Sequence, residues 1–401
     1  MTKARFGLPE DVVFCKQCVI SNQRPSSTIE FKHKTDEKKS TIGFGNDGVC
    51  YACKYHEIKE KGIDWAARDE SLKALAAKYR RTDGGYDVII PGSGGKDSAF
   101  TSHILKYKYG MNPLTVTWAP HRYTEIGWRN FENWIHVGGL DNMLFTPNGR
   151  LHRYLTQQAF LNLLHPFQPF IVGQRIIGPL LAAKFDVKLV MYGENQAEYG
   201  NNPNENYKPV MDRKFFSVQT PEDMILGGKP INTIMRETSF TINDFAPYIP
   251  PSSDYLERKE IEVHYLGYYL KWDPQECYYY AAEHTGFQSN EERTEGTYSK
   301  YSSIDDRIDM FHYYTTLIKF GIGRATYDAA QEIRNGKITR EEGVALVKRY
   351  DQEFPRRYFK DFLEYIDISE EKFIETIDSF RSEHLWDKVG GEWRLKHTVW
   401  Y

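Results

Sequence analysis

The chain has few cysteines, no long hydrophobic run and a nearly balanced charge. Five cysteines stand among 401 residues, and four of them form two CxxC pairs, which is typical of metal chemistry in a reducing compartment rather than of a disulfide framework. No stretch approaches the roughly 20 apolar residues of a membrane span, and no apolar signal segment follows the first residues. A net charge of −3 gives no general attraction to nucleic acid or to an anionic membrane. We therefore expect a cytoplasmic enzyme of two or three domains, with neither a membrane nor a nucleic-acid partner.

The sequence also lacks GxxxxGK[ST], the phosphate loop of kinases and GTPases, but it has a different glycine-rich turn. Ser93-Gly94-Gly95-Lys96-Asp97-Ser98 follows residues 86–91, which predict a short buried strand, and precedes residues 99–107, which predict a helix. Adjacent glycines let backbone N–H groups close on a phosphate, and the helix dipole favours its negative charge. Serine hydroxyls, the Lys96 charge and a Mg²⁺ ion held by Asp97 can add to this site. An ordinary polar turn is the alternative.

The two cysteine pairs predict a metal site near the start of the chain. Cys15 and Cys18 form one pair, and Cys50 and Cys53 form the other. Two such turns can complete a tetrahedral Zn²⁺ shell, and ligation by sulfur alone indicates a structural ion. An iron–sulfur cluster and unligated or redox-active thiols are the alternatives.

Strand and helix patterns alternate from residue 87 to about 195, which predicts an α/β fold with a parallel sheet covered by helices. Ligands of such sheets bind at the carboxyl ends of the strands, so the end of the second strand, at Trp118, is the expected adenine neighbourhood. We expect loops over residues 201–260 and a mainly helical chain beyond Ile261. The expected strands are 86–91, 114–118, 142–145 and 187–192, and helices are expected over 65–79 and 128–137.

Polar residues follow the fourth expected strand. A carboxylate at Glu194 can bind Mg²⁺ or take a proton from incoming ammonia, and the Asn195 amide can position a substrate carbonyl. Acidic residues are also favoured at any helix N-terminus. Both interpretations stay open for Glu194 and Asn195, and the structural one is preferred for Glu198.

Tyrosines are frequent in the C-terminal half, as in residues 265–269 and 278–280. They can stack on sugars or bases, but helix packing is the preferred interpretation. Asn335-Gly336 predicts the end of one helix, and Thr339 with Glu342 predicts a capping box at the start of the next.

A cationic set lies in the same region. Arg324, Asp328 and Glu332 share one helix face, which predicts a ladder of ion pairs. In the alternative interpretation, substrate phosphates are bound by Lys319, Arg324 and Arg334.

The glycine-rich turn resembles the PP-loop, SGGxDS, of ATP pyrophosphatases, which cleave ATP between the α- and β-phosphates. Over nearly its whole length the chain is similar to the N-acetyl sugar amidotransferase family of O-antigen, lipopolysaccharide and related surface-sugar pathways. The segments that carry this resemblance are residues 15–19 with 24–25, 48–53, 93–98, 193–200, 298–301 with 305–306, and 319–325.

The resemblance implies conversion of a sugar acetamido group to an acetamidino group. The amide oxygen attacks the α-phosphorus of ATP, pyrophosphate leaves, and ammonia then displaces AMP. The resemblance implies ATP, Mg²⁺ and Zn²⁺ as cofactors and a nucleotide-activated or free acetamido sugar as substrate. The predicted catalytic residues are Lys96, Asp97, Glu194 and Asn195, and the predicted ATP-binding residues are Pro91, Gly92, Ser93, Gly94, Gly95, Lys96, Asp97, Ser98 and Trp118. The expected domains are a Cys₄ zinc module with its connector (1–62), a PP-loop domain (63–260) and a helical region (261–401).

A glutaminase nucleophile is missing. Residue 2 is Thr rather than the cysteine of class II glutaminases, and Cys277 lacks the small neighbours of a nucleophile elbow. Cys277 is therefore expected to be a buried helix residue. Ammonia is expected from solution or from a glutaminase partner, accompanied by a barrel subunit resembling that of imidazole glycerol phosphate synthase.

The main alternative function is sulfur transfer to tRNA, because some such enzymes combine a PP-loop with CxxC zinc modules. Sulfur relay needs further reactive cysteines, and Cys277 alone would have to serve. The balanced charge also lacks the basic footprint of an RNA-binding protein. Another PP-loop ligase is a second alternative. A non-catalytic scaffold is a third, against which the intact glycine-rich turn argues.

Overall fold

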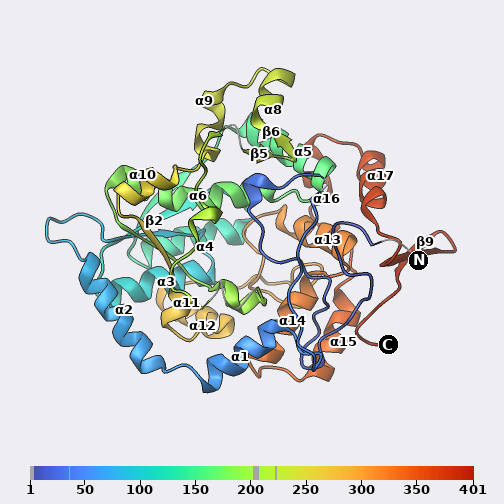
Figure 1. Cartoon of the computed structure of the whole chain (residues 1–401), viewed down its shortest axis with the longest axis horizontal. Helices are drawn as coiled ribbons and strands as arrows, with labels where there is room; N and C mark the ends of the chain where they lie inside the picture. The colour runs from blue at the N-terminus through green and yellow to red at the C-terminus, as the bar shows by residue number, and fades with distance from the viewer. Residues whose placement is uncertain (1–3, 36, 202–206, 222–223) are drawn as a thin grey trace.

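The computed structural model (Figure 1) describes residues 4–35, 37–201, 207–221 and 224–401 and contains a five-stranded parallel sheet. The sheet order is β3-β2-β1-β4-β7, and every neighbouring pair is parallel. The α/β class and the parallel sheet expected from the sequence are therefore confirmed. The strands are β1 (Val88–Pro91), β2 (Pro113–Trp118), β3 (Asp141–Phe145), β4 (Leu189–Tyr192) and β7 (Glu262–Tyr265).

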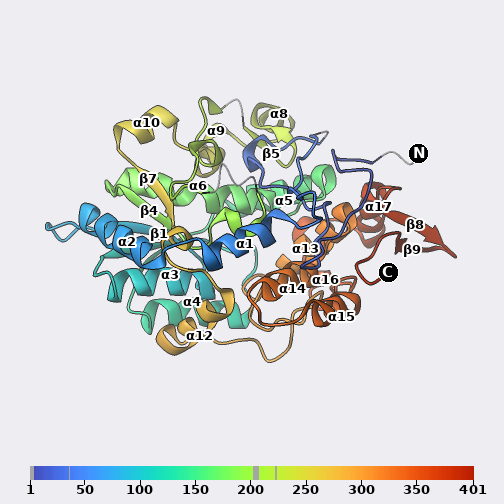
Figure 2. The same cartoon turned by 60° about the horizontal axis from the view of Figure 1, so that its bottom comes forward.

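Helices cover both faces of the sheet, so its central strands are apolar on both sides. Ile89 and Val190 pack against α6 (Gln168–Phe185), which together with α5 (Gly149–Leu163) lies on one face. Val88 and Leu189 point to the opposite face. Figure 2 shows α3 and α12 on that second side. The helices of this side are α2 (Trp65–Tyr79), α3 (Lys96–Tyr107), α4 (Glu125–His136), α11 (Leu266–Tyr269) and α12 (Pro274–Thr285).

The C-terminal region adds a second group of helices beside the sheet (Figure 1). α14 ends at Arg334 with Gly336 in the left-handed region (φ +68°), and Thr339 caps α15 in a capping box with Glu342. The predicted helix–turn–helix is therefore confirmed. The elements are α13 (Asp309–Phe320), α14 (Arg324–Arg334), α15 (Arg340–Tyr350), α16 (Phe359–Ile366), α17 (Glu370–Phe380) and the hairpin β8 (Trp386–Val389) with β9 (Glu392–Leu395).

The N-terminal residues lie against this C-terminal group rather than apart from it. Cys15, Cys18 and Val19 share a buried cluster with Ile322 and Val347. Figure 2 shows the blue N-terminal segment beside the orange and red helices. This segment contains η1 (Glu30–Lys32) and leads into α1 (Tyr51–Lys61).

Two expectations about secondary structure are wrong. Residues 262–265 were expected to be helical, but they form β7 because Val263 pairs with Val190 and is fully buried at the edge of the sheet. The 201–260 region is not purely loop, since it contains η3 (Arg213–Phe215), β5 (Ile225–Leu226), β6 (Lys229–Pro230), α8 (Ile231–Glu237), α9 (Ile242–Phe245), η5 (Ala246–Tyr248) and α10 (Ser253–Arg258). The parts of this expectation that concern residues 202–206 and 222–223, and the remark on Thr2, lie outside the described residues. The three domain boundaries stay a prediction.

Candidate active site

The Ser93–Ser98 turn joins the carboxyl end of β1 to the first turn of α3, as the sequence predicts. Gly94 has φ +84°, and a Cβ there would lie 2.7 Å from Cα of Phe131. Both the backbone conformation and the close approach of α4 therefore require glycine. The first turn of α3 leaves backbone N–H groups without helical acceptors, so the turn presents donors where an anion binds best.

Side chains fix the shape of this turn. Ser98 Oγ donates to the carbonyl oxygen of Gly95 (3.0 Å), and Lys96 Nζ lies 2.6 Å from Asp97 Oδ2. Burial opposes the charge of Lys96, but the Asp97 carboxylate outweighs it and raises the pKa of Lys96. Asp97 Oδ1 is buried without a hydrogen-bond partner in the described part of the chain. Asp97 can therefore offer one carboxylate oxygen to a Mg²⁺ ion while the other holds Lys96.

The C-terminal region reaches the turn through Asp305. Ser93 Oγ donates to Asp305 Oδ2 at 2.7 Å, although the two residues lie 212 positions apart. Burial raises the pKa of Asp305. Two parts of the chain therefore hold the turn in place. One is the first turn of α3, and the other is the segment before α13, which contains Asp305.

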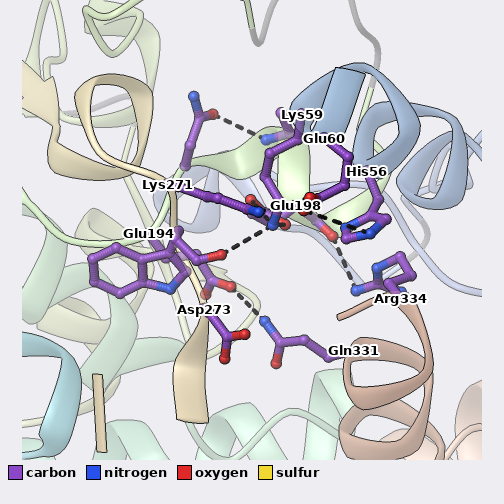
Figure 3. A network of polar contacts seen from close by, with 12 residues as sticks. His56, Lys59, Glu60, Glu194, Glu198, Lys271, Asp273, Gln331 and Arg334 are labelled. Atoms are coloured by element: carbon purple, nitrogen blue, oxygen red, sulfur yellow. Dashed lines mark hydrogen bonds and ion pairs between the residues drawn. The ribbon is translucent and has the colours of Figure 1, made fainter. Parts of the chain in front are cut away.

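Glu194 lies just beyond the carboxyl end of β4. Its Oε1 accepts a hydrogen bond from Gln331 Nε2 of α14 (2.9 Å), and its Oε2 accepts one from the Tyr199 hydroxyl. Figure 3 shows Gln331 pointing toward Glu194. Burial, reinforced by the nearby charge of Asp97, raises the pKa of Glu194 to about 7. Glu194 can therefore exchange a proton near neutral pH, as a general base or acid requires.

Asn195 and Glu198 have structural roles in η2 (Gln196–Tyr199). Asn195 Oδ1 accepts from the Ala197 N–H (3.0 Å) and caps the helix. Glu198 is buried and pairs with Lys59 Nζ of α1 at 2.9 Å, a contact visible in Figure 3. The structural interpretation of Glu198 is confirmed. A catalytic role for Asn195 stays a prediction, and Asn195 is not among the residues that line the cavity described next.

A cavity of about 720 Å³ opens beside the turn and is lined by all three regions of the chain. This volume is in the range of small-molecule sites. Its walls include Arg24 from the N-terminal segment, Lys96 and Glu194 from the sheet edge, and Asp309 and Gln331 from α13 and α14. The turn, Glu194 and the C-terminal helices therefore face one shared space.

The three predicted phosphate ligands also line this cavity, but each has an internal partner. Lys319 Nζ donates to the carbonyl oxygen of Leu163 (2.7 Å), and burial lowers its pKa to about 7. Arg324 Nε lies 3.0 Å from Asp328 Oδ1, which confirms the first step of the predicted ion-pair ladder. Arg334 Nη2 donates to the backbone oxygen of Glu198 (3.3 Å).

The predicted ladder does not continue past Asp328. Glu332 accepts hydrogen bonds from the hydroxyls of Tyr298 (2.7 Å) and Tyr301 (3.5 Å) rather than extending the ion pairs. The role of Lys319, Arg324 and Arg334 in binding substrate phosphates stays a prediction.

Three other features are not part of the cavity lining. Trp118 is buried at the end of β2 against Gly173 of α6 and the ring of Tyr248, and its contact with adenine stays a prediction. Cys277 is buried in α12, as expected. None of the tyrosines in 265–269 and 278–280 lines the cavity, and Tyr265 and Tyr269 are buried, which agrees with packing.

The four cysteines of the CxxC pairs converge in a buried group. The Sγ atoms of Cys15 and Cys53 lie 3.8 Å apart, as do those of Cys18 and Cys50. Ligand bonds of about 2.3 Å in a tetrahedron place sulfur atoms about 3.8 Å apart, so the group fits a single Zn²⁺ ion. Backbone N–H groups of Gln17, Cys18 and Cys50 point at Cys15 Sγ and stabilise its charge.

Sequence reasoning missed several polar residues of the cavity. Tyr199, Gln331, Asp309, and the group of Glu30, His33 and His165 all line it. Of the missed contacts, those of Tyr199 and Asp305 lay in segments quoted for the family resemblance (193–200 and 305–306). The others are isolated polar residues whose neighbours in sequence give no signal.

A family model matches the C-terminal part of the chain. Residues 295–399 match the family model described as "LPS biosynthesis protein WbpG-like, C-terminal domain", which covers about a quarter of the chain. This match links the C-terminal region to proteins of lipopolysaccharide biosynthesis. A search of curated proteins found no significant match. Of the helices in the described ranges, none is long and apolar enough to cross a membrane.

Proposed function

We propose that this chain is an ATP-dependent amidotransferase that converts the acetamido group of a sugar to an acetamidino group in surface-polysaccharide biosynthesis. One observation carries the proposal. The Ser93–Ser98 turn opens at the carboxyl edge of a parallel sheet onto a cavity that it shares with residues 295–399, the region similar to lipopolysaccharide biosynthesis proteins.

The first step uses the anion site. The amide oxygen of the substrate attacks the α-phosphorus of ATP, the bond to the β-phosphate oxygen breaks, and pyrophosphate leaves toward the N–H groups of the turn. Lys96 adds positive charge to the departing phosphates, and the Ser93 hydroxyl is oriented by Asp305. Mg²⁺ accompanying ATP would be held by Asp97 and would neutralise phosphate charge.

The second step uses Glu194. Ammonia adds to the activated imidate carbon, and AMP leaves with the former amide oxygen. The attacking nitrogen must lose protons, and a carboxyl group whose pKa is raised to about 7 can accept one at neutral pH. The buried position of Cys277 argues against sulfur transfer, because that thiol has no access to the cavity.

Purified protein should be incubated with ATP, ammonium and a panel of nucleotide-activated and free acetamido sugars. We expect AMP and pyrophosphate in equal amounts and a sugar in which NH replaces the amide oxygen. Formation of ADP and orthophosphate, or no nucleotide cleavage with any acetamido sugar, would contradict the proposal.

The variant Asp97→Ala should lower turnover by about 10²–10³-fold, as removal of a transition-state contact does. Asp254→Ala is a matched control, because Asp254 is also in the first turn of a helix but is exposed and lies outside the cavity. It should leave turnover unchanged.

A further inference from the structure

A second group of metal-type ligands lies in the cavity, apart from the four cysteines. It consists of Glu30, His33 and His165, whose ligand atoms all lie within 4.8 Å of one another. Glu30 Oε2 is 3.2 Å from His165 Nε2 and 3.6 Å from His33 Nδ1. All three residues line the cavity.

The spacing of these atoms fits a single ion. Bonds of about 2.1 Å in a tetrahedron place ligand atoms about 3.4 Å apart, close to the two shortest distances here. Glu30 Oε2 and His33 Nδ1 are buried and have no hydrogen-bond partner among the described residues. Apart from the approach of His165 Nε2 to Glu30 Oε2, these two buried atoms lack a polar partner at hydrogen-bond distance, and an ion bound between the three side chains would supply one.

The rest of the group is already held in place by neighbouring residues. Thr28 Oγ1 donates to the other carboxylate oxygen of Glu30 (3.1 Å), and Gln168 Nε2 donates to the Glu30 backbone oxygen (2.8 Å). The second ring nitrogen of His33 lies 4.0 Å from Glu37 Oε2. The two hydrogen bonds to Glu30 are outer contacts of the kind that orient a metal ligand.

Two buried lysines, Lys39 and Lys319, also lie near this group.

We propose that Glu30, His33 and His165 bind one divalent first-row transition ion, such as Zn²⁺, in addition to the ion of the four cysteines. Two imidazoles and one carboxylate leave coordination positions open, which distinguishes this site from the closed sulfur site. The open positions belong to a wall of the cavity, where a ligand oxygen can complete the shell. This inference does not rest on the proposed ATP chemistry.

Metal binding can be tested without any assay of activity. Protein purified with zinc in the cysteine site is treated with a chelator to empty weaker sites and is then titrated with Co²⁺. We expect one further equivalent to bind, with the weak visible bands of nitrogen and oxygen ligation and without thiolate charge-transfer absorption. Binding of no further equivalent, or binding only with a thiolate spectrum, would overturn the proposal.

Variants locate the ion. Glu30→Gln and His165→Gln should each weaken Co²⁺ binding at least tenfold while the zinc content and the circular dichroism spectrum stay unchanged. His136→Gln, in an exposed position of α4, is the matched control and should bind as the original protein does. Two variants are used because one of them can fail to fold. Unchanged Co²⁺ affinity in either folded variant would refute the assignment.

Discussion

At the scale of single residues, the most informative side chain is that of Glu194, because its surroundings in the folded protein change its pKa. Its carboxylate is enclosed by Tyr199 and Gln331 and lies within the field of Asp97. Burial raises its pKa to about 7, against about 4.3 in an unfolded chain. The folded state therefore keeps a proton that the unfolded state releases between these two values. The contribution of Glu194 to stability consequently falls as the pH rises from about 4.3 to 7.

Replacement of this carboxyl by an amide should remove that dependence. We expect Glu194→Gln to be more stable relative to the original protein at pH 8 than at pH 5, by on the order of 1–2 °C in unfolding temperature. The same variant should lower ammonia-dependent product formation by about 10²-fold, the usual size of a general-base effect. Thermal scans of both proteins at the two pH values check the first expectation. A difference between the two proteins that does not change with pH would show that Glu194 titrates normally.

At the scale of elements, a buried ion pair joins α1 to η2. Lys59 and Glu198 are 1% and 4% exposed, respectively, and Lys59 Nζ also donates to the carbonyl oxygen of Trp272 (2.9 Å). The pair thereby ties the connector after the cysteine site to the strand end that carries Glu194. Removal of one partner leaves a buried charge uncompensated, which typically costs about 3–5 kcal/mol.

Lys59→Met should therefore lower the free energy of unfolding by several kcal/mol, and the double variant Lys59→Met with Glu198→Gln should recover much of that loss. Lys61→Met is the matched control, because the Lys61–Glu57 pair of the same helix is 76% and 64% exposed and is worth at most about 1 kcal/mol. Urea unfolding measures all three variants. A Lys59→Met protein as stable as Lys61→Met would mean that water already reaches the pair.

Elements with strong local signals could be predicted, and those defined by distant partners could not. β1 is an apolar run buried on both faces, and α15 begins with a capping box, so both are visible in the sequence. β7 contains Glu262 and His264 and is only four residues long, and its pairing with β4 rather than its composition makes it a strand.

The candidate site divides in the same way. The Ser93–Ser98 turn and the cysteine pairs are local motifs, and both lie where the sequence places them. The contacts Ser93–Asp305 and Glu194–Gln331, and the group of Glu30 with His165, join distant segments. These contacts could not be predicted from patterns of neighbouring residues, because they arise from the packing of η1, α6, α13 and α14.

At the scale of the whole molecule, the cavity is built by three regions that the sequence presents one after another. The cysteine group packs on α14 and α15, and Arg340 Nη2 of α15 lies 3.5 Å from the Cys15 carbonyl oxygen. The N-terminal segment therefore packs between the C-terminal helices and the edge of the sheet, and it contacts both. Loss of metal from the cysteines should consequently affect the cavity wall as well as the cysteine turns.

The burial of Cys277 also bears on the source of nitrogen. Outside the cysteine group the only thiol of the 401 residues is Cys277, which is 2% exposed and whose pKa is raised well above its usual value by burial. A buried neutral thiol is a poor nucleophile. We therefore expect turnover with ammonium salts, faster at higher pH where more free NH₃ is present, and almost none with glutamine until a glutaminase subunit is added.

The variant Cys277→Ala separates the two nitrogen sources. It should keep ammonia-dependent turnover within about twofold of the original protein, and the small cavity it creates should lower stability by about 1–2 kcal/mol. Product formation with glutamine and with ammonium, measured side by side, checks this expectation. Efficient use of glutamine by the isolated chain, abolished by Cys277→Ala, would mean that α12 opens to expose the thiol. The chain would then supply its own ammonia and need no glutaminase partner.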